Sequence, residues 1–135
     1  MSTTLPSVSA MYAAILGLLA VLLTVRVILN RVKTGIQAGD GGNPQLAQAI
    51  RAHANLAEQV PLALLLIVLA ETVGTPAMVI HALGAVLVIA RIANAWGLSR
   101  SLGPTMPRQS GAGMTILVVA AASLLILYRV LMAHA

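Results

Sequence analysis

The chain lacks cysteine and phenylalanine altogether, and it carries few charged residues. Of its 135 residues only 8% are charged, whereas 59% are hydrophobic and the mean hydropathy is +0.96. Without cysteine, neither a disulfide framework nor catalysis by a protein thiol is available. A soluble domain carries about 25% charged residues. So few charges could not cover a surface that faces water, and the composition therefore predicts a membrane protein.

Acidic and aromatic residues are scarce as well. Three Asp and Glu residues stand against eight Lys and Arg residues, which gives a net charge of +5, and the aromatic residues are two Tyr and one Trp. Nucleic-acid binding needs a dense basic face, often interleaved with aromatic side chains. The basic residues here are dispersed along the chain, so we expect no nucleic-acid partner and interpret the positive charge as a guide to membrane topology.

Four long apolar segments account for most of the chain, at about residues 7–29, 44–71, 76–98 and 111–133. Each segment can cross the ~30 Å hydrocarbon core of a bilayer as a helix. The alternating pattern of a membrane β-barrel is missing. The sequence therefore predicts an all-α fold, an integral membrane four-helix bundle that forms one domain over residues 1–135.

The positions of the basic residues predict the orientation of this bundle. All but one lie in or near the first and third loops, and only Arg129 lies near the opposite ends. Because cytoplasmic loops carry an excess of Lys and Arg, we expect both long loops in the cytoplasm and both termini outside. The residues near the two loops are Arg26, Arg31, Lys33, Arg51, Arg91, Arg100 and Arg108.

A stripe of polar residues marks the first half of the second segment. The uncharged run 59–70 rises only ~18 Å as a helix, so Arg51, Asn55 and Glu58 should lie at membrane depth. At ~100° per residue these three fall within an arc of about 60°, and His53 points away. A cation, an amide and a carboxylate suit a zwitterionic ligand. The alternative is a network that only fixes helix packing.

Two residues of the third segment extend this polar region. Arg91 can reach a depth similar to that of Glu58, and Asn94 follows one turn later. Arg91 is equally consistent with a ligand contact and with an ion pair to Glu58. Arg108 precedes the fourth segment, where a cation beside the positive end of a helix dipole could stabilise a thiolate. The alternative for Arg108 is an ordinary anchor at the membrane surface.

The remaining polar residues suggest no further chemistry. His53 and His81 lack a carboxylate or second histidine at metal-ligand spacing, so we expect no metal site and interpret each as a hydrogen-bonded packing residue. Glu71 lies near a helix end and is expected to be solvated. Arg100 is interpreted as a loop charge.

Two strings, GDGGNPQLAQAIRAHANLAEQVPL at residues 39–62 and RIANAWGLSR at residues 91–100, resemble the MAPEG family, the membrane-associated proteins of eicosanoid and glutathione metabolism. The Arg-x-x-x-Asn-x-x-Glu pattern with its following proline is fairly specific, and the similarity is greatest to small bacterial members. The resemblance implies a homotrimer in a bacterial inner membrane, with glutathione bound between neighbouring subunits as a cosubstrate. The residues implied to bind glutathione are Arg31, Arg51, Asn55, Glu58, Arg91 and Asn94.

The resemblance also assigns a catalytic role to Arg108, which matches the arginine held to activate the glutathione thiol. A cation lowers the pKa of a thiol and so raises its thiolate fraction. The chain departs from the family pattern at Gln59, Asn94 and Leu98, where aromatic or imidazole side chains are common. The implied function is a glutathione-dependent transferase or peroxidase that acts on lipophilic small molecules entering from the bilayer. The alternative is a non-catalytic relative whose polar stripe serves trimer assembly or binds another small ligand.

Overall fold

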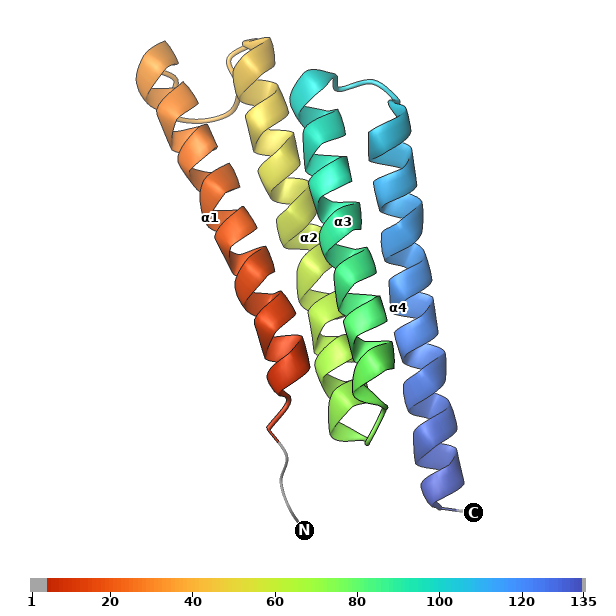
Figure 1. Ribbon diagram of the computed structural model, residues 1–135. Helices are drawn as coiled ribbons and strands as arrows, with labels where there is room; N and C mark the ends of the chain where they lie inside the picture. The colour runs from red at the N-terminus through yellow and green to blue at the C-terminus, as the bar shows by residue number, and fades with distance from the viewer. Residues whose placement is uncertain (1–4, 135) are drawn as a thin grey trace.

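The computed structural model describes residues 5–134, and within that range it is a bundle of four helices (Figure 1). They are α1 (Ser7–Thr34), α2 (Pro44–Thr72), α3 (Ala77–Arg100) and α4 (Met106–Ala133). The shortest has 24 residues and therefore rises about 36 Å, more than the ~30 Å of a bilayer core. All four are long and apolar enough to cross a membrane, which confirms the predicted all-helical membrane fold.

α1 and α4 extend well beyond the apolar segments that predicted them, whereas the ends of α2 and α3 differ from the prediction by at most two residues. α1 continues past Leu29 to Thr34, and it ends where Gly35 adopts a left-handed conformation with a φ of 70°. α4 begins at Met106 rather than at residue 111. Pro107 fits in the first turn of α4 because the N–H that proline lacks has no partner within a helix at that position.

The helices run alternately in opposite directions, and both ends of the described chain lie at the same end of the bundle (Figure 1). The α1–α2 and α3–α4 loops lie together at the other end, which we call the two-loop end. α2 and α3 occupy the centre. Within the described residues α1 contacts α2 and α3 but not α4. Because all basic residues except Arg129 lie in or near these two loops, most of the positive charge is at the two-loop end.

The outer surface of the bundle is apolar. Leu18, Leu22, Leu117 and Leu124 are each 67–68% exposed, whereas the contacts between the helices bury a core that includes Leu87. Apolar patches of this extent are unfavourable in water and mark an interaction with lipid or protein. The exposed leucines are thus consistent with helices that are surrounded by a bilayer.

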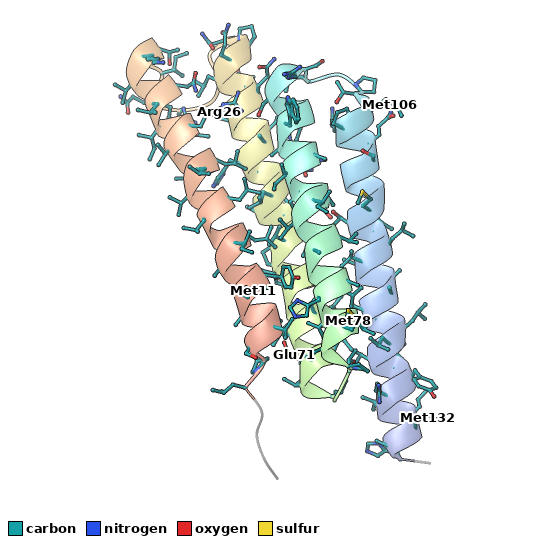
Figure 2. All side chains as sticks on the ribbon, viewed as in Figure 1. Met11, Arg26, Glu71, Met78, Met106 and Met132 are labelled. Atoms are coloured by element: carbon teal, nitrogen blue, oxygen red, sulfur yellow. The ribbon has the colours of Figure 1, made fainter. Side chains whose placement is uncertain are left out.

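Glu71 joins α2 to α1 at the end of the bundle opposite the two loops. Its two carboxylate oxygens accept hydrogen bonds from the backbone N–H groups of Val8 (3.0 Å) and Ser9 (2.7 Å). α1 has no capping side chain of its own, so α2 supplies the acceptor that the first turn of α1 needs. Glu71 lies near the end of α2 and stays partly exposed, as expected, but the prediction missed its contact with the first turn of α1 (Figure 2).

A second polar contact beside Glu71 joins α1 to α3. The Tyr12 hydroxyl lies 3.0 Å from Nδ1 of His81, and the two rings meet edge to face. His81 is therefore a hydrogen-bonded residue of the helix interface, as predicted. His53 makes no hydrogen bond to any described residue and instead lines an apolar groove between α1 and α2. The predicted hydrogen bond of His53 is absent from the described part of the chain.

We expect Gly84→Ala to destabilise the bundle, because an added Cβ would overlap the ring of Tyr12. Overpacking of this kind typically costs about 1–3 kcal/mol. Gly17→Ala is the matched control, since nothing lies within 4 Å of its added Cβ and alanine favours a helix. Thermal unfolding in detergent should show a lower midpoint for Gly84→Ala and an equal or higher midpoint for Gly17→Ala. Equal midpoints for the two variants would contradict the packing described for Tyr12.

Candidate functional site

The side chain of Arg91 joins three helices near the two-loop end. It is only 1% exposed, and its Nη1 donates to Oδ1 of Asn55 on α2 at 2.9 Å. Its Nη2 donates to the backbone oxygen of Gly111 on α4 at 3.0 Å, while Nε has no partner among the described residues. The alternative of an Arg91–Glu58 ion pair is therefore wrong, and a neutral amide takes the place of the carboxylate.

Two glycines allow α4 to approach α3 closely enough for these contacts. A Cβ on Gly111 would lie 2.9 Å from the backbone nitrogen of Asn94 and closer still to the oxygen of Ala90. A Cβ on Gly97 would lie 2.7 Å from the backbone nitrogen of Arg108. Our sequence reasoning missed both glycines. The signal for them was the enrichment of small residues where membrane helices pack together.

Asn94 and Arg108 continue this network toward the α3–α4 loop. Nδ2 of Asn94, which is 3% exposed, donates to the backbone oxygen of Arg108 at 3.0 Å. The Arg108 side chain turns toward the loop, where Nη1 donates to the oxygens of Leu102 (2.6 Å) and Gly103 (3.1 Å). Its remaining N–H groups make no hydrogen bond to a described residue. The guanidinium is thus held in place while part of it stays available to a ligand.

These residues line an open cavity of about 360 Å³ between α2, α3 and α4. The lining combines three residues that the sequence predicted with three that it did not. No carboxylate belongs to the lining, so the polar groups are one guanidinium and side-chain amides. Such a lining is complementary to a ligand that carries negative charge or peptide groups. The lining residues are Asn55, Asn94, Pro104, Arg108, Gln109 and Ala112.

Of the predicted residues that do not line this cavity, Arg91 lies beside it, whereas the other three lie away from it. Arg51 and Glu58 form a loose ion pair at 3.8 Å, with side chains that are 48% and 55% exposed on the outer face of α2. Nη1 of Arg31 donates to the oxygens of Ile36 (3.2 Å) and Gly39 (2.9 Å) and so holds the α1–α2 loop. Within one chain the structure therefore brings together Asn55, Arg91, Asn94 and Arg108, but it does not bring Arg31, Arg51 or Glu58 to them.

A membrane four-helix bundle with a polar cavity near its two-loop end is the class of protein that these features define. The sequence model of the MAPEG family matches residues 9–128, and the chain belongs to this family. The protein is similar to "Inner membrane protein YecN" of Escherichia coli (strain K12), with 34% identity over 95 residues. That alignment covers 70% of this chain and 72% of YecN, and the protein of the same name from Escherichia coli O6:H1 matches equally well.

The structure predicts that Arg91 cannot be replaced by lysine without loss of stability. Lysine keeps the charge but lacks the planar fork that reaches Asn55 and Gly111 together, so at least one acceptor loses its partner. A buried polar group left unsatisfied costs about 1–3 kcal/mol.

Arg100→Lys is the control, because the Arg100 side chain is exposed and only stacks on Trp96. Unfolding in detergent should show a clear loss for Arg91→Lys and a change within about 0.5 kcal/mol for Arg100→Lys. Equal stability of both variants would argue against the bridging role of Arg91.

Proposed function

We propose that the protein is a membrane-bound, glutathione-dependent transferase or peroxidase that acts on lipophilic electrophiles. The observation that carries this proposal is the cavity lined by Asn55, Asn94 and Arg108, which offers a cation and amides but no carboxylate. Glutathione is a peptide with net negative charge and therefore complements such a lining. Membership of the MAPEG family supports the same ligand.

Arg108 is the residue we propose to activate the thiol. It lies in the first turn of α4, where the helix dipole adds positive potential, and its position is fixed by the loop carbonyls. A positive potential stabilises a thiolate over a thiol, and the released proton passes to water. In the transferase reaction the thiolate sulfur bonds to an electrophilic carbon of a substrate that reaches the open cavity from the apolar surface, and the leaving group departs with the electron pair of the broken bond. In the peroxidase reaction the thiolate attacks a peroxide oxygen and breaks the O–O bond, which gives a sulfenic acid and an alkoxide that takes a proton from water. A second glutathione then reduces the sulfenic acid to glutathione disulfide and water.

We further propose that the Arg51–Glu58 pair faces a second copy of the chain in a homotrimer. Both side chains are about half-exposed on the outer face of α2, and charged groups in a bilayer normally face protein or a polar cavity. The implied glutathione ligands Arg31, Arg51 and Glu58 would then contribute at the contact between subunits. We place the protein in an inner membrane like its relatives, with the two-loop end in the cytoplasm because of its basic residues.

Titration of the purified protein with glutathione, followed by thiolate absorbance at neutral pH, tests the proposed enzyme. We expect saturable binding of glutathione and a thiolate signal from the wild-type protein. Arg108→Ala should lower the thiolate fraction of bound glutathione about tenfold, because removal of a nearby cation raises the thiol pKa by at least one unit. Arg100→Ala, which removes an exposed arginine close to the same loop, is the control. Absence of binding at millimolar glutathione would eliminate the proposal.

A second candidate is a non-catalytic relative whose charged pair serves assembly, and the position of Arg51 and Glu58 outside the cavity favours it. Under this alternative Glu58→Gln should dissociate the trimer in detergent and leave glutathione binding per folded chain unchanged. Asp40→Asn is the control, because it removes the same charge from the α1–α2 loop. Molecular mass in detergent and binding are measured on the same samples. A trimer that survives Glu58→Gln with weakened binding would exclude this alternative.

A further inference from the structure

Protein contacts fix the orientation of the Asn55 amide. The partner of this amide is Nη1 of Arg91, and a guanidinium can only donate hydrogen bonds. The atom of Asn55 that faces Arg91 must therefore be its oxygen, whichever way an amide might otherwise be turned. The NH₂ group of Asn55 makes no hydrogen bond to a described residue, and Asn55 lines the cavity. Asn55 thus offers a ligand hydrogen-bond donors.

The Asn94 amide is fixed in the opposite sense. Its partner is the backbone oxygen of Arg108, which can only accept. The atom that faces Arg108 must therefore be the Asn94 nitrogen, and the side-chain oxygen is left without a hydrogen bond from the described residues. Only 3% of the Asn94 surface is exposed, yet this residue lines the same cavity. Its oxygen is not one of the fully buried polar atoms that lack a partner, so the cavity gives access to it and it offers a ligand an acceptor.

From these two orientations we infer that Asn55 and Asn94 together bind one peptide group of the ligand. Asn55 donates to the carbonyl oxygen of that group, and Asn94 accepts its N–H. A carboxylate can accept a hydrogen bond from Asn55 but would be repelled by the oxygen of Asn94. An ammonium group can donate to the oxygen of Asn94 but has no acceptor for the NH₂ group of Asn55. This inference rests on the proposed function, and it deepens it. Arg108 selects negative charge, whereas the two asparagines select a peptide bond.

The sharpest test changes the ligand and leaves the protein intact. Two glutathione analogues are compared with glutathione, and in each one peptide N–H is replaced by an ester oxygen. This replacement removes the donor that Asn94 requires and weakens the carbonyl that Asn55 binds. We expect one of the two analogues to bind the wild-type protein at least about tenfold more weakly than glutathione, because a site built for an N–H rejects a ligand that lacks it. Equal affinities for all three ligands would overturn the inference and leave the proposed function intact.

Asn94→Leu then shows whether the loss arises at Asn94. This variant should bind glutathione more weakly and no longer distinguish it from the affected analogue. Asn30→Leu is the matched control, since it removes an amide from α1 that bonds only to the oxygen of Arg26, and it should keep the wild-type discrimination. An undiminished preference for glutathione in Asn94→Leu would overturn the inference. If Asn94→Leu does not fold, the ligand comparison on wild-type protein decides alone. A wild-type protein that binds no glutathione overturns both the inference and the proposed function.

Discussion

Burial of the Arg91 guanidinium is the interaction on which the arrangement of α2, α3 and α4 depends. A buried cation is expensive, and here its hydrogen bonds go to an amide and a backbone carbonyl instead of a carboxylate. These bonds are strong because one partner is charged. They require α4 to come close to α3, which glycine at position 111 permits. The same bonds turn the Asn55 amide, so helix packing and the chemistry of the cavity have one origin.

α1 is held in a different way from the other helices. Its polar contacts lie at the two ends of the bundle, where Glu71 binds its first turn and Arg26 donates to the Ser99 hydroxyl (Figure 2). Between these points α1 packs through apolar side chains such as Leu16 and Leu23. Lipid tails are as apolar as leucine, so apolar contact alone drives helix association weakly in a bilayer. Polar contacts at both ends therefore fix how α1 lies against α2 and α3.

The sequence predicted the elements better than it predicted the contacts between them. Long apolar runs define membrane helices because the bilayer requires them, and the matching depth of Arg91 correctly placed it beside the polar stripe of α2. The partner itself was misjudged, because Asn55 and Glu58 are one turn apart and spacing does not decide which of them faces α3. The acceptor at Gly111 was missed because it is a backbone oxygen, and the sequence indicated only that a small residue at this position could let two helices approach closely. The start of α4 was misplaced because Pro107 is compatible with a loop and with a first helical turn.

The fixed position of Arg108 bears on how the cavity can stabilise an anion. An arginine with a mobile side chain would have to be reoriented before it could stabilise a thiolate, and this reorganisation would cost free energy. Here two loop carbonyls hold Nη1, and the Arg108 backbone in turn receives the Asn94 amide. A charge that is fixed before the ligand arrives costs no reorganisation when negative charge develops, which is the arrangement that favours catalysis most. The loop contacts that hold Arg108 are therefore what would suit this guanidinium to the thiolate of the proposed function.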